Sequence, residues 1–231
     1  MPTVVTEIYT KQPMVRPKLN NMKLLDKLKW RYATKAMNGK NVSQAKIDKI
    51  IEAVSLAPSS SGLQPYEIIV ITNQEVKDKI RPIAWNQSVI SDCSHLLVFA
   101  AWDTYTAERI NIVFDLTNKI RDLKNEGWEN YRKLLLDTYP QKDAEENFNH
   151  AAKQAYIALA IAITAAALQD IDSTPMEGFD AEAVDNYLGL REKGLRSCVI
   201  LAIGYRDVEN DWLVNLKKVR KSIEDLVTIM D

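Results

Sequence analysis

Apolar and polar residues follow two different periods along this chain. Between residues 47 and 54 apolar residues recur at i, i+3, i+4 and i+7, which predicts an amphipathic helix. Residues 95–101 and 198–205 are nearly continuous apolar runs, and residues 68–71 form a shorter one. Such runs are typical of strands buried in a sheet. The pattern therefore predicts a core in which helices pack against buried strands.

Further helical patterns fill most of the remaining chain. Residues 155–168 contain one polar member, Thr164, which predicts a helix buried on all sides and also used between subunits. This run is shorter than the roughly 20 apolar residues that cross a bilayer, so we expect no membrane span. The other helices are expected from about residue 22, over 74–84, in two helices over 105–138, and over 181–187 behind the N-cap Asp180.

The composition bounds the function. The chain has 231 residues with a net charge of −1, which does not suggest binding to nucleic acid or to an anionic membrane. Two distant cysteines, Cys93 and Cys198, indicate neither a zinc site nor any other metal site, and we expect reduced thiols in the cytoplasm. Residues 1–21 lack the apolar stretch of a secretory signal. They predict an extended N-terminal arm, followed by a single domain over residues 22–231.

A serine-rich loop joins the end of a predicted helix to the start of a predicted strand. It runs from Ala57 to Tyr66, with Ser59, Ser60, Ser61 and Gly62 placed between two prolines. Prolines stiffen its edges, and glycine permits a positive φ, so the loop could wrap a polar ligand. The alternative is a turn whose serines contact only water.

Two groups of cations stand near the ends of the chain. Arg31 and Lys35 could share a face of a helix, or alternate with Tyr32 and Thr34 in an extended segment. Residues 217–221 contain four cations. The first pair could converge on one anion, and the second group could hold a phosphate. The alternative for both groups is a solvated surface. The common nucleotide-binding, hydrolase and zinc-protease motifs are absent from the sequence.

Taken together, these motifs resemble the FMN-dependent nitroreductase family, and most closely its bacterial oxygen-insensitive nitroreductases and dihydropteridine reductases. The matching residues are Arg31–Ala36, Ala57–Tyr66, Asn86, Pro175–Asp180 and Lys218–Arg220. The resemblance implies an α+β fold with a central, mostly antiparallel sheet flanked by helices. It also implies a domain-exchanged homodimer with FMN at the interface, in which Leu226–Ile229 of the chain end joins the partner's sheet.

The resemblance assigns roles to individual residues. Arg31, Lys218 and Arg220 would clamp the FMN phosphate, while the serines would meet the ribityl chain. The backbone at Glu177 and Gly178 would approach the flavin N5. The full set of implied cofactor residues is Arg31, Tyr32, Ala33, Lys35, Pro58, Ser59, Ser60, Ser61, Gln64, Asn86, Pro175, Glu177, Gly178, Lys218 and Arg220. The implied substrate pocket consists of Lys35, Ser61, Trp128 and Tyr131.

The chain departs from the family at four positions near the expected site. Ala33 stands where a serine is frequent, and Tyr32 replaces a frequent histidine. Gly62 stands where many members carry asparagine, and Val89 where the closest branch has a lysine. The loss of that lysine leaves the choice between NADH and NADPH open.

The implied activity is an FMN-dependent oxidoreductase with NADH or NADPH as electron donor. Hydride would pass to the flavin N5, and a nitroaromatic, quinone or related small acceptor would then use the same pocket, in a ping-pong mechanism. No side chain is expected to act as a catalytic acid or base. The alternatives are another flavin enzyme on this fold, such as a dehalogenase or a flavin-destroying enzyme, and a non-enzymatic helical dimer.

Overall fold

The computed structural model describes residues 21–230, and an antiparallel sheet of four strands lies at its centre. The strand order is β1-β2-β4-β3, and every neighbouring pair is antiparallel. This arrangement confirms the expected α+β class and the antiparallel sheet. The strands are β1 (Tyr66–Ile71), β2 (His95–Trp102), β3 (Asp172–Met176) and β4 (Leu195–Gly204). All three predicted strands are present, and β4 begins three residues before its predicted start at residue 198.

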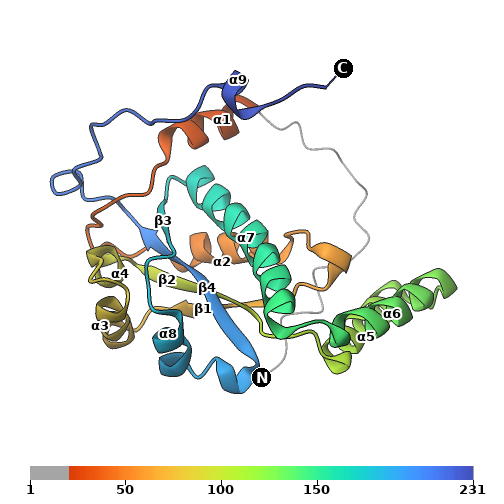
Figure 1. The fold of residues 1–231 in the computed structure, drawn as a ribbon. Coiled ribbons are helices and arrows are strands. Elements are labelled where there is room, and N and C mark those ends of the chain that lie inside the picture. The colour runs from red at the N-terminus through yellow and green to blue at the C-terminus, as the bar shows by residue number, and fades with distance from the viewer. Residues whose placement is uncertain (1–20, 231) are drawn as a thin grey trace.

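Helices cover both faces of this sheet (Figure 1). The α-helices are α1 (Asn21–Trp30), α2 (Gln44–Ser55), α3 (Gln74–Ile83), α4 (Ser88–Asp92), α5 (Ala107–Arg121), α6 (Glu126–Thr138), α7 (Ala144–Leu168), α8 (Ala181–Leu188) and α9 (Ile223–Leu226). Short 3₁₀ turns are η1 (Ser60–Gly62), η2 (Tyr139–Gln141) and η3 (Arg191–Lys193).

The alternation of side chains along β2 divides the core into two layers. Leu97 and Phe99 pack with α2 and α7 on one face of the sheet. Leu96 and Val98 pack with residues of α3, α4 and α8 on the other face. This is the period of two expected for a strand covered on both sides. It explains why the sequence of β2 is apolar at nearly every position.

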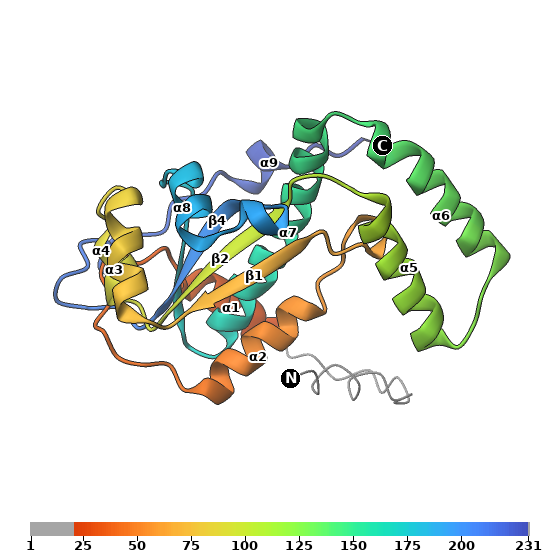
Figure 2. The same cartoon turned by 90° about the horizontal axis from the view of Figure 1, so that it is seen from below.

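The helices α5 and α6 form a hairpin that extends away from the sheet (Figure 2). The predicted pair of helices over 105–138 is confirmed, with a break at Asp122, whose φ is +49°, and a new N-cap at Asn125. The hairpin has its own small core, in which Tyr105, Ile110 and Phe114 are fully buried. This core also includes Leu63 and Ala101, which lie outside the hairpin, so it attaches the hairpin to the rest of the protein at its base.

The helix α7 is longer than the sequence predicted. It starts at Ala144 because the Asp143 side chain accepts hydrogen bonds from the N–H groups of Glu145 and Glu146. At 25 residues, with a mean hydropathy of 1.5 in its most apolar part, its length no longer argues against a membrane span. Its packing against α2 and β2 instead marks it as a core helix. The prediction that this helix is buried on all sides is wrong for the single chain, since Ile157 is 39% exposed.

Both ends of the described chain differ in detail from the prediction. Of the arm predicted over residues 1–21, residues 1–20 lie outside the described part, and Asn21 already belongs to α1. The C-terminal segment forms the short α9 and then an extended stretch from Val227. Leu226 is helical here, and Ile229 is 80% exposed. The single chain thus leaves this tail uncovered, and its addition to a partner's sheet stays a prediction.

Candidate functional site

Three cations gather where α1 ends and the C-terminal segment passes. The Lys218 amine donates a hydrogen bond to the backbone carbonyl of Arg31. Burial lowers the pKa of Arg31, and the nearby charge of Arg220 lowers it further. The pKa of Lys218 is likewise lowered by burial and then by Arg31 and Arg220. Among residues 21–230 none of the three forms an ion pair with a carboxylate.

Arg31 is the most unusual member of this cationic cluster. Its Nε and Nη2 atoms are buried and have no hydrogen-bond partner in the described part of the chain. An unsatisfied buried donor on a charged group is costly, so such a site is expected to bind an acceptor. The phosphate-binding role expected of Arg31, Lys218 and Arg220 therefore fits their arrangement.

A fourth cation nearby, Arg206, is already neutralised. Arg206 contacts the buried Asp172 carboxylate through Nε at 2.9 Å and Nη2 at 2.5 Å. Its guanidinium lies 4.5 Å from the ring centre of Trp30 and 4.6 Å from that of Tyr32. Arg206 thus lies near Arg31 and packs on the rings of Trp30 and Tyr32. Sequence reasoning missed this role because the partners of Arg206 are distant in sequence.

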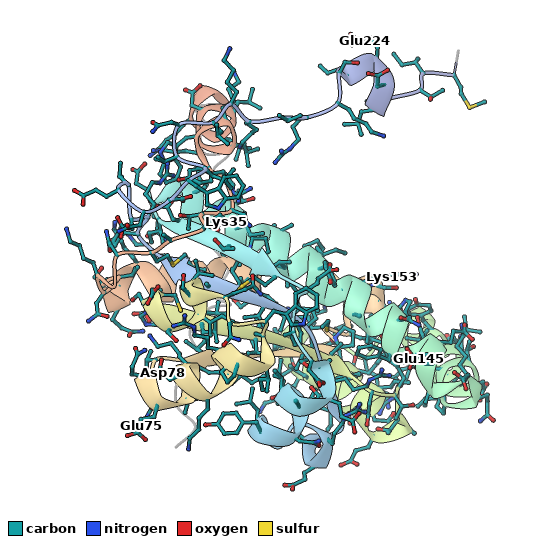
Figure 3. All side chains as sticks on the ribbon, turned by 60° about the vertical axis from the view of Figure 1, so that its left-hand side comes forward. Lys35, Glu75, Asp78, Glu145, Lys153 and Glu224 are labelled. Carbon is teal, nitrogen blue, oxygen red and sulfur yellow. The ribbon has the colours of Figure 1, made fainter. Side chains whose placement is uncertain are left out.

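The segment that carries Arg31 and Lys35 lies outside the helix and bends at Lys35, so the helical alternative left open by the sequence is excluded. It follows α1 and leads to a β-bridge between Met37 and Arg206. The Lys35 side chain is exposed, and Figure 3 places it between α1 and the labelled acids of α3. The Ala33 side chain, where a serine is frequent, adds no hydroxyl to this segment.

A tight turn after β3 presents unpaired backbone donors. Among the described residues, the N–H groups of Glu177 and Gly178 donate no hydrogen bond, whereas the Gly178 carbonyl accepts one from Gln87 at 2.9 Å. The Glu177 carboxylate accepts a hydrogen bond from the Tyr156 hydroxyl at 2.6 Å. Pro175 lies in β3, which is an edge strand of the sheet. An edge strand tolerates proline because the missing N–H can be on the side without a neighbouring strand.

Trp85 covers this turn, and sequence reasoning missed it. A Cβ atom placed on Gly178 would lie 2.7 Å from the Trp85 ring, so the glycine makes room for the indole. Trp85 is 75% exposed and has a φ of +55°, as does the adjacent Asn86. An unusual backbone of this kind clusters at binding sites. Val89, at the position where the closest branch has a lysine, is buried in the core.

The serine loop is an ordered turn. Ser61 and Gly62 have φ values of +56° and +65° inside η1. The Ser59 hydroxyl accepts a hydrogen bond from the Gln64 N–H at 2.9 Å. The Ser60 N–H donates to the side chain of Gln154 on α7 at 2.8 Å. Gln154, which the sequence analysis did not single out, thus fixes the loop from beneath, while Pro58 and Ser60 remain exposed.

Three of the four predicted pocket residues meet beside this loop. The hydroxyls of Ser61 and Tyr131 lie 2.6 Å apart. Trp128 stacks on Phe114 with ring centres 4.3 Å apart, and its buried indole N–H has no partner among the described residues. A cavity of about 230 Å³ lies next to them, lined by Gly62, Leu63, Gln64, Val113, Leu116, Thr117, Ile120 and Arg121.

The structure divides the predicted site into two groups within one chain. The first, here called the cation half-site, contains Arg31, Lys35, Lys218, Arg220 and the turn at residues 177–178. The second, the serine half-site, contains the loop between α2 and β1 together with α6. Figures 1 and 2 both place that loop on the side of α5, away from the segment after α1. Lys35 therefore does not share a pocket with Ser61, Trp128 and Tyr131 in the single chain.

Known proteins resemble this chain in sequence and in fold. A model of the nitroreductase family matches residues 28–205. The major NAD(P)H-flavin oxidoreductase of Aliivibrio fischeri is 32% identical over 216 residues, which cover 90% of this chain and 98% of that protein. The oxygen-insensitive NAD(P)H nitroreductase of Salmonella typhimurium is 29% identical over 207 residues, covering 86% and 95%.

A solved structure agrees with the fold. A protein from Exiguobacterium sibiricum, crystallised in complex with FMN, superposes with a TM-score of 0.75 at 18% identity, covering 90% of this chain and 97% of that one. At this identity the likeness speaks for the fold. The family model and the A. fischeri relative, which each match most of the chain, carry the assignment further. The chain therefore belongs to the nitroreductase family.

Proposed function

We propose that this protein is an FMN-dependent oxidoreductase that takes electrons from NAD(P)H and passes them to small acceptors. The observation that carries the proposal is a cluster of three cations in which the buried Nε and Nη2 atoms of Arg31 have no hydrogen-bond partner among the described residues. A phosphate supplies the negative charge and the acceptor oxygens that this cluster lacks. The flavin-binding relatives named above make FMN the natural ligand.

We place the complete site between two copies of the chain. Each half-site lacks what the other holds: one has the phosphate-binding cations, and the other has the serine turn and the aromatic residues of α6. Exposed apolar surface on Ile157 of α7 and on the tail residues Ile223, Leu226 and Ile229 needs cover. A homodimer would cover this surface and join the cation half-site of one subunit to the serine half-site of its partner.

The residues of this chain would then hold and orient the flavin. Arg31, Lys218 and Arg220 would bind its phosphate, and Lys35 would stand near the ring edge where negative charge develops on reduction. The free N–H groups of Glu177 and Gly178 would donate to the ring. When bound, FMN supplies the hydride chemistry, so no side chain of the protein needs to act as acid or base.

The same pocket would serve donor and acceptor in turn. The Ser61 and Tyr131 hydroxyls lie 2.6 Å apart at the serine turn, and Gly62, the next residue of that turn, lines a cavity where a planar ring could stack. Nitroaromatics and quinones are the acceptors that we expect, in a ping-pong cycle. Cys93 and Cys198 are both free thiols, which fits the reducing cytoplasm where we expect the protein to act.

Another flavin reaction on the same fold, such as dehalogenation or flavin destruction, can be distinguished from the proposed reaction by the products of aerobic turnover.

The first experiment is to purify the protein and analyse the heat-released supernatant for flavin. We expect about one FMN per chain and no FAD. NADH and NADPH are then compared as donors with a quinone and with a nitroaromatic. Protein that stays colourless after FMN is added would refute the flavin proposal.

A further inference from the structure

A single buried carboxylate ties the segment after α1 to the C-terminal part of the chain. Oδ2 of Asp211 accepts hydrogen bonds from the hydroxyls of Tyr32, at 2.8 Å, and of Thr34. The same oxygen accepts a third hydrogen bond from the backbone N–H of Lys35 at 3.1 Å. Asp211 is 2% exposed, so water does not compete for these contacts. One oxygen atom therefore contacts three of four consecutive residues.

The carboxylate is itself firmly held. Its Oδ1 atom accepts a hydrogen bond from the Leu213 N–H at 3.0 Å, and the Asp211 N–H donates to the Asp207 carbonyl at 2.9 Å. Burial raises the pKa of Asp211, but the hydrogen bonds that it accepts, chiefly from Thr34, outweigh burial and keep this pKa below its usual range. Asp211 is thus an ionised, fixed acceptor around neutral pH.

The neighbours of Tyr32 and Thr34 make this contact relevant to the site. Arg31 directly precedes Tyr32, and Lys35 directly follows Thr34. Thr34 is fully buried, whereas Lys35 is exposed. The three hydrogen bonds to Asp211 therefore fix the short stretch of backbone that carries both cations.

We propose that Asp211 is a positioning residue that preorganises Arg31 and Lys35 for the flavin. The inference rests on the proposed function. The Tyr32 hydroxyl, at a position where the family often has histidine, serves this anchor. A segment that is already fixed loses less conformational entropy when the ligand binds, so the anchor raises affinity without touching the ligand.

The test compares FMN with riboflavin, which lacks the phosphate. Apoprotein carrying Asp211→Asn is titrated with each ligand. We expect the dissociation constant for FMN to rise roughly tenfold or more, which is the effect of weakening one charge-assisted contact. The constant for riboflavin should rise much less, so that the preference for FMN over riboflavin falls. General destabilisation of the fold would instead weaken the binding of both ligands alike.

Asp207→Asn is the matched control. It makes the same chemical change four residues earlier, at a carboxylate whose hydrogen bonds within residues 21–230 go to Glu209 and Asn210 of its own turn. Its preference for FMN should equal that of the wild type. If Asp211→Asn does not fold, Tyr32→Phe replaces it, since this change keeps the ring beside Arg206 and removes one hydrogen bond to Asp211. We expect a smaller loss of preference in the same direction.

Two outcomes separate the positioning role from the flavin site itself. A wild-type preference for FMN in the folded variant that is tested would overturn the role of Asp211 and leave the proposed function standing. A wild-type protein that binds FMN no better than riboflavin would instead overturn the phosphate site on which the inference depends.

Discussion

Replacing Arg31 by methionine should change stability and ligand affinity in opposite directions. In the described part of the chain, the buried Nε and Nη2 atoms of Arg31 have no hydrogen-bond partner, and two further cations, Lys218 and Arg220, lie nearby. Leaving such a donor unsatisfied costs about 1–3 kcal/mol. Methionine keeps an unbranched apolar stem and removes both donors and the charge. We therefore expect the apoprotein variant Arg31→Met to be more stable than the wild type, by about 1 kcal/mol or more.

Binding of FMN by the same variant should be weaker. The loss of a charge-assisted contact to phosphate costs roughly 1.5–3 kcal/mol, which is a rise of about 10- to 150-fold in the dissociation constant. Titration of apoprotein with FMN measures the affinity, and thermal unfolding without flavin measures the stability. A gain of 1 kcal/mol corresponds to a rise of roughly 2–4 °C in the melting temperature for a chain of this size.

The control is Lys29→Met, which removes an exposed cation from the end of the same helix, α1. This change should alter neither quantity beyond about 0.5 kcal/mol, as is usual at the surface. An Arg31→Met apoprotein that melts below the wild type would show that the guanidinium has partners that stabilise the fold. An unchanged affinity for FMN would show that the cationic cluster does not bind the phosphate.

Three further predictions follow from other parts of the structure. Lys35→Met should retain flavin but make its midpoint potential more negative, because the cation favours the reduced form; a redox titration with an equal or higher potential would contradict this. Deleting residues 222–231 should lower the mass seen by light scattering and abolish activity together, and a truncated protein that stays an active, yellow dimer would disprove the role of the tail. Burial holds the pKa of both His95 and His150 below the usual range. As the pH falls, these two histidines are therefore protonated in the unfolded chain before they are protonated in the folded protein. The free energy of unfolding should therefore fall as the pH drops below about 6.5, and a double His→Gln variant should lose this dependence.

The sequence alone determined the strands and most of the helices. Period and apolar content decide these elements locally, so residues 95–101 could be assigned to a strand buried on both faces before any contact was known. The family could also be named from short motifs, because residues 57–66 and 175–180 each combine proline, glycine and polar groups in a specific order. The start of α7 was missed because its first turns, from Ala144, are amphipathic and do not continue the apolar run.

Only the tertiary structure decided how the predicted site residues are distributed. Motif order says nothing about distance in space, so the sequence could not show that Arg31 and the serine turn lie on different sides of one chain (Figures 1 and 2). It could not find the contacts of Asp211 with Tyr32, Thr34 and Lys35, which lie more than 170 positions earlier. Nor could it show that Trp85 packs on Gly178. Such contacts form when the sheet and its helices bring distant segments together, and no local pattern encodes them.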